Sequence, residues 1–267
     1  MHIYLHGVPF WYIDEGDRSS IPVIFLHGFP FSHEMWTEQV SLVAKRYRAI
    51  AYDLRGHGRS FVGDGQFTIE QHVDDLFGLM DLWKAEKPVI VGLSMGGYIT
   101  LRALERDQQR FRAAVLCDTK SEADTNEGKL KRFENMKIVR EQGSEAFAEM
   151  FVRNVFAAES LTNKPDAVQR IKKIIAATPP LSIAGTLLAL AARTDTTAFL
   201  SQIAIPTLIL VGEKDVTTPP AASQAMHEKI RTSEMHIIPN AAHMSNLENP
   251  EEFNRHLMAF LERVAQQ

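Results

Sequence analysis

The chain has 267 residues, of which 45% are hydrophobic and 23% charged, a balance typical of a globular domain and unlike a disordered or fibrous chain. Its formal net charge is −4, and no run of like charge is long enough to predict a nucleic-acid or membrane surface. Cys117 is the only cysteine, so an internal disulfide is excluded.

The first ten residues, MHIYLHGVPF, lack the basic start and long apolar stretch of a secretory signal. The apolar stretch at residues 183–192 is too short to span a bilayer. We therefore expect a cytoplasmic protein that binds neither membrane nor nucleic acid. No feature of the sequence predicts an oligomeric state.

Strand-like and helical patterns alternate along most of the chain. Residues 2–14 alternate in the manner of two strands around a His6-Gly7 turn, which predicts an antiparallel hairpin. Short apolar runs rich in β-branched residues follow, at residues 23–26, 49–52, 89–91, 113–116 and 207–211. Runs of this kind are typical of strands buried on both faces of a parallel sheet. Amphipathic segments such as residues 68–84 separate them, so we expect an α/β fold built from βαβ units.

The alternation breaks between residues 120 and 200, which look helical and contain no strand-like run. We interpret them as a helical cap inserted into a core formed by residues 1–119 and 201–267. Pro165, Pro179 and Pro180 are expected to divide the cap into at least three helices. Apolar side chains at helical intervals should pack on the core or line a pocket. They are Phe133, Met136, Phe147, Met150, Phe151 and Phe156.

The apolar run that starts at Val89 leads into a G-x-S-x-G sequence centred on Ser94, and a helical segment begins directly after the serine. This context is a nucleophile elbow, in which Gly92 and Gly96 permit a turn too tight for side chains. The helix that begins at Met95 directs its positive end to the place where negative charge develops in acyl transfer. The alternative is that the glycines serve only tight packing and the serine is incidental.

A serine nucleophile requires a base and an acid from other parts of the chain. His243 follows the predicted strand at residues 235–238, and Asp215 follows the preceding strand. Loops at the carboxyl ends of strands are where open α/β sheets build their sites. The chain order Ser94, Asp215, His243 is the order of this kind of site, and the carboxylate would orient the imidazole. Taken alone, Asp215 would be read as a surface turn or a helix cap.

Two glycine-containing loops follow other predicted strands. His27-Gly28-Phe29 resembles the segment that supplies half of an oxyanion hole, and we assign the two donors to the backbone N–H groups of Phe29 and Met95. A simple β-turn at the same place is the alternative. Residues 53–60, DLRGHGRS, are interpreted as structural, because their glycines suit a turn and their charges can satisfy loop backbone.

These motifs together resemble the α/β-hydrolase family over nearly the whole chain. They are HGFP at 27–30, DLRGHGRS at 53–60, GLSMGG at 92–97, GEKD at 212–215 and AAH at 241–243. Within this family the sequence is most similar to bacterial carboxylesterases and 3-oxoadipate enol-lactonases. The resemblance implies a mostly parallel eight-stranded sheet with a helical cap, a small ester or lactone substrate, an acyl-enzyme at Ser94, and neither cofactor nor metal. Because position 94 is serine, the aspartate-dependent dehalogenases and epoxide hydrolases are excluded.

Asp118 is an alternative acid, because some members of this family place the acid after the earlier strand at residues 113–117. We favour Asp215, which matches the more common family position. Asp118 is instead expected to cap the start of the helical cap.

Other functions use the same residues. A carbon–carbon bond hydrolase or a perhydrolase would share the triad, and a non-catalytic ligand-binding protein can retain it. A dianionic lactone would also need cationic side chains in the pocket, and the sequence alone places none there.

Overall fold

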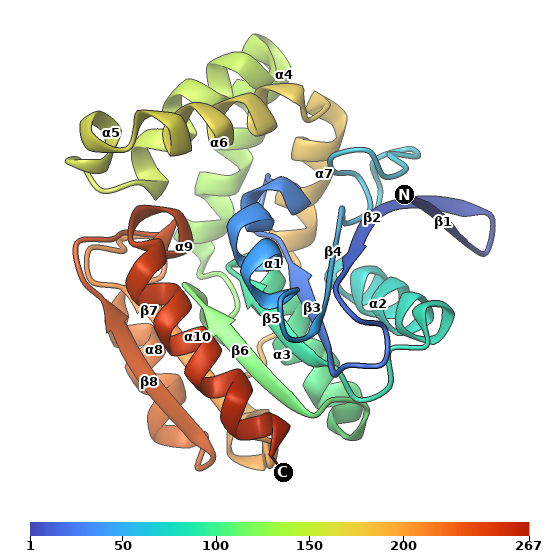
Figure 1. The fold of residues 1–267 in the computed structure, drawn as a ribbon. Helices are drawn as coiled ribbons and strands as arrows, with labels where there is room; N and C mark the ends of the chain where they lie inside the picture. Colours follow the sequence, from blue (N-terminus) through green and yellow to red (C-terminus); the bar gives the residue numbers. More distant parts are fainter. Residues whose placement is uncertain (267) are drawn as a thin grey trace.

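A mixed sheet of eight strands forms the centre of the computed structural model, which describes residues 1–266 (Figure 1). The strands are β1 (His2–Leu5), β2 (Val8–Glu15), β3 (Pro22–Leu26), β4 (Arg48–Tyr52), β5 (Val89–Leu93), β6 (Ala113–Cys117), β7 (Thr207–Gly212) and β8 (Ser233–Ile238). Their order in the sheet is β1-β2-β4-β3-β5-β6-β7-β8. β1 and β2 form the antiparallel hairpin, and β3 to β8 pair in parallel. The predicted fold class and hairpin are therefore confirmed.

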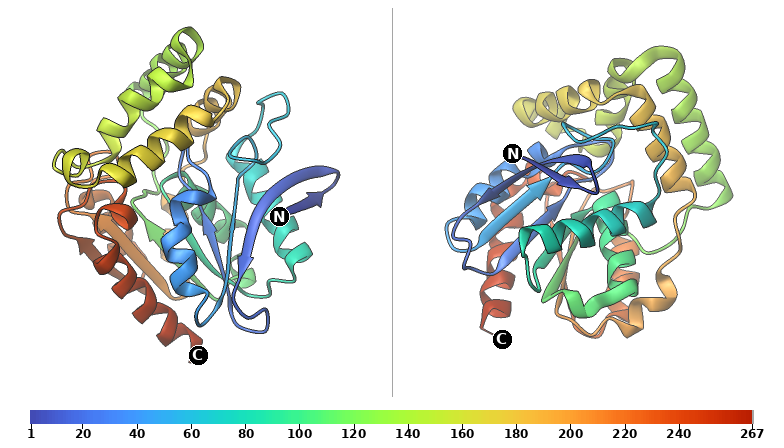
Figure 2. Two further views of the ribbon diagram at one scale, coloured as in Figure 1. Left: turned by 45° about the horizontal axis from the view of Figure 1, so that its top comes forward. Right: turned by 90° about the vertical axis from the view of Figure 1, so that its right-hand side faces the viewer.

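Helices cover both faces of the sheet, which explains why β4 to β7 are buried along their whole length. α1 (Thr37–Val43) and α10 (Pro250–Ala265) lie against one face (Figure 2). α2 (Ile69–Trp83), α3 (Met95–Asp107) and α8 (Pro220–Lys229) lie against the other. The short helix α9 (Ser245–Glu248) joins β8 to α10. Side chains from both faces and the strands between them form one hydrophobic core.

Four helices between β6 and β7 lie over the carboxyl ends of the parallel strands, at the top of Figure 1. They are α4 (Asn126–Val155), α5 (Ser160–Asn163), α6 (Pro165–Ala177) and α7 (Pro180–Ala191), and we call them the cap helices. α4 is interrupted at Gly143, whose φ of 81° is not helical. Pro165 and Pro180 occupy the first turns of α6 and α7, where a missing N–H costs nothing. The limits of the inserted cap at residues 120 and 200 remain a prediction.

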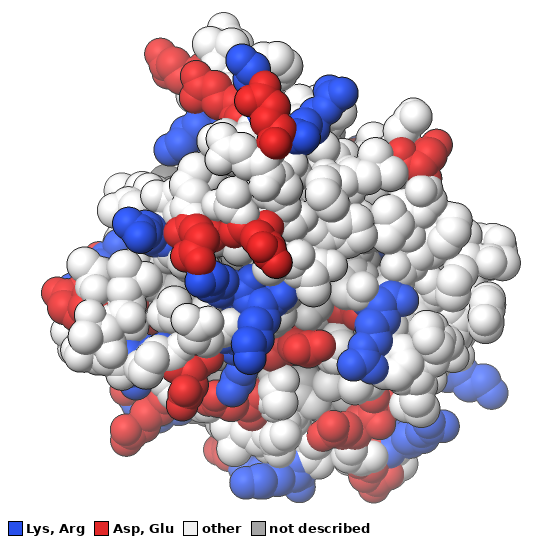
Figure 3. All heavy atoms as spheres, turned by 90° about the horizontal axis from the view of Figure 1, so that it is seen from above, with Lys and Arg blue, Asp and Glu red and all other residues white. Residues whose placement is uncertain are grey.

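The cap helices carry charge of both signs on their outer surface. Seen from above, basic and acidic side chains are interspersed (Figure 3). Among residues 1–266, no single helix has the length and hydropathy needed to cross a bilayer; α6 and α7 reach them only together, across a bend of 97°.

Candidate active site

Ser94 lies between β5 and α3 in a strained backbone conformation, with φ 53° and ψ −112°. Positive φ is costly for a residue with a side chain and persists only when the surroundings enforce it. Here the Ser94 N–H donates to the Cys117 carbonyl at 2.9 Å, and the Thr119 hydroxyl donates to the Ser94 carbonyl at 2.9 Å. β6 and the residues directly after it therefore hold this turn in place.

The two glycines around Ser94 are required by close approach of backbone. A Cβ atom on Gly92 would collide with the carbonyl oxygen of Gly96, and one on Gly96 would collide with the carbonyl oxygen of Leu26 at the end of β3. Neither obstacle is a flexible side chain, so neither can move aside cheaply. The G-x-S-x-G spacing thus follows from the packing of α3 against β5 and β3.

His243 and Asp215 meet at the carboxyl end of β7 and β8. The imidazole Nδ1 lies 2.8 Å from Asp215 Oδ2, and both side chains are buried. A carboxylate only accepts hydrogen bonds, so Nδ1 carries the proton and Nε2 is left as an acceptor. The N–H groups of Thr217 and Thr218 donate to Asp215 Oδ1 at 2.8 and 3.0 Å. These bonds fix the carboxylate, and through it the orientation of the ring.

The charged forms of His243 and Asp215 stabilise each other. Burial lowers the pKa of His243, but Asp215, with smaller contributions from Asp118 and Glu248, outweighs burial and raises the pKa above its ordinary value of 6.5. Burial raises the pKa of Asp215, but His243 and the hydrogen bonds from Thr218 outweigh it, so this pKa is lowered. An imidazolium that forms at His243 would therefore be stabilised.

Ser94 and His243 line one cavity of about 280 Å³, together with Phe29 from the loop after β3. No hydrogen bond joins the Ser94 hydroxyl to the imidazole in the described part of the chain. Hydrogen bonds of this type often tighten only when substrate binds. The structure thus brings the predicted nucleophile and base to one cavity and joins the base to the predicted acid.

Phe29 lines the Ser94 cavity from the loop after β3, and Met95 directly follows Ser94 as the first residue of α3. Among residues 1–266, neither residue's backbone N–H has a hydrogen-bond acceptor. Gly28 lies between Leu93 and Phe31, and a Cβ atom there would come within 3.1 Å of both side chains. Both backbone N–H groups are therefore free to donate to a ligand, as the prediction of an oxyanion hole requires.

His27 holds the loop that carries Phe29. Its Nδ1 donates to the Gly28 carbonyl at 2.8 Å, and its Nε2 accepts from the Leu54 N–H at 3.0 Å. Burial lowers the pKa of His27 to about 3, so the ring is neutral at physiological pH. Both nitrogens are thus occupied by backbone, which suits a structural role for His27.

Asp118 directly follows β6 and lies close to the His243 and Asp215 pair. Its Oδ1 accepts from the Gly212 N–H at 2.8 Å, and its Oδ2 is bonded to the Ser245 hydroxyl. Burial, followed by repulsion from Asp215, raises the pKa of Asp118 well above its ordinary value. The expectation that Asp118 caps the start of the cap was wrong, because its two oxygens bond to the last residue of β7 and the first residue of α9. Its carboxylate makes no hydrogen bond to the imidazole of His243.

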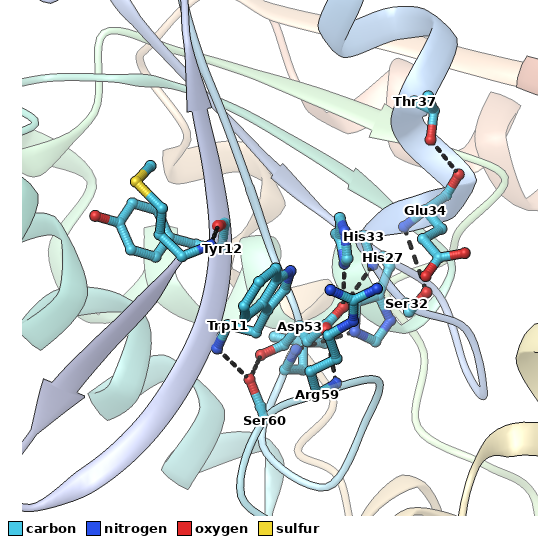
Figure 4. Close-up of polar contacts among 12 residues, drawn as sticks. Trp11, Tyr12, His27, Ser32, His33, Glu34, Thr37, Asp53, Arg59 and Ser60 are labelled. Atoms are coloured by element: carbon cyan, nitrogen blue, oxygen red, sulfur yellow. Dashed lines mark hydrogen bonds and ion pairs between the residues drawn. The ribbon is translucent and has the colours of Figure 1, made fainter.

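The loop of residues 53–60 is organised around Asp53 (Figure 4). Asp53 Oδ1 accepts from the N–H of His33 at 2.8 Å and from its Nδ1 at 2.6 Å, and Oδ2 accepts from the Arg59 N–H at 2.8 Å. Ser60 Oγ donates to the Asp53 carbonyl at 2.6 Å. Burial lowers the pKa of His57 to about 4. These bonds tie together the loops after β3 and β4, in keeping with a structural motif.

Basic side chains line the cavity on the side of the cap. They are Lys120, Lys131 and Arg132, with Asp124 as the one acid beside them. Asp124 is bonded to both Arg132 and Arg193, the latter at 2.7 Å.

Lys120 has no ion-pair partner within residues 1–266, and burial, followed by repulsion from Arg193, lowers its pKa. Sequence reasoning missed the four charged residues of this wall, since no pattern showed which side of the cap they face. Within residues 1–266, no group of three or more His, Cys, Asp or Glu side chains is placed to hold a metal ion.

Comparisons with known proteins agree with this architecture. The model of the alpha/beta hydrolase fold family matches residues 21–250. A curated relative, 3-oxoadipate enol-lactonase 2 of Acinetobacter baylyi, is 28% identical over 93% of this chain and 91% of its own. The solved structure of a thermophilic esterase from Thermogutta terrifontis, with malate bound, has a TM-score of 0.93 and 32% identity over 99% of both chains. The enol-lactonase from Burkholderia xenovorans has a TM-score of 0.91 and 26% identity over 98% of this chain and 100% of its own. The chain therefore belongs to the alpha/beta hydrolase fold family.

Proposed function

We propose that this protein is a carboxylic ester hydrolase in which Ser94 is the nucleophile, His243 the general base and Asp215 the orienting acid. The observation that carries the proposal is the strained serine in a cavity shared with a histidine whose Nδ1 is bonded to a buried carboxylate. The esterase and enol-lactonase relatives support the same class of reaction.

The proposed reaction has two acyl transfers. His243 Nε2 takes the proton of Ser94 Oγ while the oxygen attacks the ester carbonyl, and the Phe29 and Met95 N–H groups bind the resulting oxyanion. The carbon–oxygen bond to the leaving alcohol then breaks, and the imidazolium returns the proton to that oxygen. Water attacks the acyl-enzyme with His243 as base again, which releases the acid and regenerates Ser94. For a lactone, alcohol and acid remain parts of one product.

The cavity wall favours an ester or lactone that carries a carboxylate. Apolar side chains such as Phe151 and Leu187 line the cavity and can pack against an acyl chain. Lys120 and Lys131 offer positive charge and have no ion-pair partner in the described residues. Partial burial removes water from the lysine ammonium group, which costs free energy. A substrate carboxylate that binds the ammonium group offsets part of that cost. The names of the enol-lactonase relatives are in keeping with such a substrate.

Turnover of p-nitrophenyl butyrate tests the reaction. The wild-type protein should hydrolyse it steadily, and the Ser94→Ala variant should fall to the background rate because no nucleophile remains. Undiminished turnover in Ser94→Ala would contradict the proposal. A wild-type protein that binds esters without turnover would instead be a ligand-binding member of the family.

The charge preference has its own test, with monomethyl succinate compared against dimethyl succinate. Lys120→Gln should lower kcat/KM for the half-ester about tenfold and leave the diester nearly unchanged, the loss expected for one ionic contact of about 1.4 kcal/mol. Lys129→Gln is the matched control, because Lys129 is an exposed lysine on α4 outside the cavity lining. An equal loss on both esters in Lys120→Gln would refute charge recognition.

A further inference from the structure

A short cap segment at the end of α4, residues 154–157, is bonded to both loops of the proposed triad. The Asn154 carbonyl accepts from the Thr217 hydroxyl at 3.3 Å, in the loop that carries Asp215. The Val155 carbonyl accepts from the N–H of Met244 at 3.2 Å, next to His243. The acid loop and the base loop are therefore both attached to the cap at this one place.

Glu248 of α9 makes a second link between the same parts of the molecule. Its Oε1 accepts from the Ala242 N–H at 2.8 Å, one residue before His243, and its Oε2 accepts from the Ala157 N–H at 2.8 Å, in the cap segment. Glu248 is only 3% exposed and forms no ion pair within residues 1–266. A buried carboxylate without a cation is costly unless its oxygens receive hydrogen bonds. Both oxygens are satisfied only while the cap segment and the His243 loop keep these positions.

The cap segment also forms part of the cavity wall. Asn154 and Val155, at the end of α4, line the cavity together with Phe151 and Ser94. A substrate that packs against this wall therefore contacts the same short segment that contains Ala157, whose N–H donates to Glu248. The Glu248 carboxylate in turn accepts from the N–H of Ala242, the residue before His243.

We propose that Glu248 is a positioning residue that couples the cap wall of the cavity to His243, so that the position of the cap sets the position of the imidazole. This inference rests on the proposed function, because it presumes that His243 is the base. Glu248 does not contact the substrate cavity itself. Its role is to hold the base where Nε2 reaches Ser94 Oγ.

Glu248 also contributes charge near the base. The titratable groups that face His243 are Asp215 from the loop after β7, Asp118 from the end of β6 and Glu248 from α9, and Lys120 lines the same cavity. Burial lowers the pKa of His243, and the three carboxylates together outweigh burial and raise it. Loss of the charge at Glu248 should therefore lower the pKa of His243, whereas a displaced carboxylate should leave it nearly unchanged.

Two variants separate position from charge. Glu248→Gln keeps the length of the side chain, but its amide nitrogen cannot accept from one of the two N–H donors. Glu248→Asp keeps the charge but is one carbon too short to reach both donors. Glu159→Gln is the matched control, because the exposed Glu159 also joins the cap to the acid loop, through Lys214 at 2.9 Å. An exposed ion pair of this kind contributes little.

The experiment measures kcat and KM for p-nitrophenyl acetate from pH 5 to 9, on proteins whose folded state is checked by circular dichroism at the assay temperature. We expect kcat to fall about 10- to 100-fold in Glu248→Gln and Glu248→Asp with KM changed less than about threefold, as for a small displacement of a catalytic group. The midpoint of the kcat/KM profile should move to lower pH in Glu248→Gln only, and Glu159→Gln should match wild type.

Folded Glu248→Gln and Glu248→Asp proteins with wild-type kcat would overturn the coupling. An equal fall in kcat in Glu159→Gln would also overturn it, because it would show that the effect is not specific to Glu248. Ser94→Ala, measured in parallel, keeps the two proposals apart. If that variant retains turnover, the proposed function fails; if it is inactive and the Glu248 variants are unchanged, only the positioning role fails.

Discussion

Asp215→Asn should disable the proposed base through a specific change of tautomer. The N–H groups of Thr217 and Thr218 donate to Oδ1, so the amide oxygen of an asparagine must occupy that place. Its NH₂ group then takes the place of Oδ2, the oxygen that lies 2.8 Å from His243 Nδ1 in the wild-type protein. Because an amide NH₂ donates, Nδ1 must become the acceptor, and the ring proton moves to Nε2. A protonated Nε2 cannot take the proton of Ser94.

The expected loss in kcat is about 10⁴-fold, which corresponds to about 5.5 kcal/mol of transition-state stabilisation. Asp118→Asn provides the comparison. Its amide oxygen can still accept from the Gly212 N–H, and its NH₂ can donate to the Ser245 hydroxyl. Because both hydrogen bonds are kept, kcat should fall less than about tenfold. The assay is steady-state hydrolysis of p-nitrophenyl butyrate by variants that retain the wild-type circular dichroism spectrum. A larger loss in Asp118→Asn than in Asp215→Asn would assign the acid to Asp118 and refute this reasoning.

Three further predictions follow from the site. The kcat/KM for a neutral ester should rise with pH through a midpoint above 6.5, because the pKa of His243 is raised and only the neutral ring accepts a proton. A flat profile from pH 5 to 8, with chemistry limiting, would exclude a histidine base. Gly96→Ala should lower the free energy of unfolding by about 3 kcal/mol and abolish turnover, since its Cβ meets the Leu26 carbonyl oxygen; wild-type stability in urea titration would contradict this. Short-chain p-nitrophenyl esters should be hydrolysed better than C12 to C16 esters, because the cavity is only about 280 Å³; equal kcat/KM across the series would argue against a bounded pocket.

The sheet could be predicted from the sequence because burial on both faces leaves a direct mark. The runs within β3 to β7 are almost entirely apolar and only four to six residues long, and no other element among residues 1–266 combines these two properties. The elbow at Ser94 was equally visible, since steric crowding leaves glycine as the only choice on either side. Patterns that sterics or burial impose at single positions are thus readable without a structure.

The cap was less predictable, because a helical pattern does not state which neighbour its apolar side meets. Phe147 and Phe151 pack near Phe29 at the cavity, but Phe133 on the same helix is 60% exposed. The interruption at Gly143 separates these two parts of α4, so one periodic pattern could not describe both. The inward position of the basic side chains was hidden for the same reason.

Some buried polar residues had no recognisable signal at all. Glu248 follows the base by five residues in a segment rich in Asn and Glu, a composition typical of an exposed helix start. Its burial depends on two N–H groups that tertiary folding supplies, one from the cap and one from the loop after β8. Asp118 was noticed but misjudged, since its partners Gly212 and Ser245 are distant in sequence.

Covalent labelling tests the central claim, that Ser94 is the nucleophile, most directly. The protein should be incubated with a fluorophosphonate, which phosphonylates activated serine hydroxyls, and the modified peptide mapped by mass spectrometry. We expect one equivalent bound at Ser94, loss of esterase activity in proportion to labelling, and no labelling in Ser94→Ala. Labelling at another serine, or inactivation with Ser94 unmodified, would contradict the account.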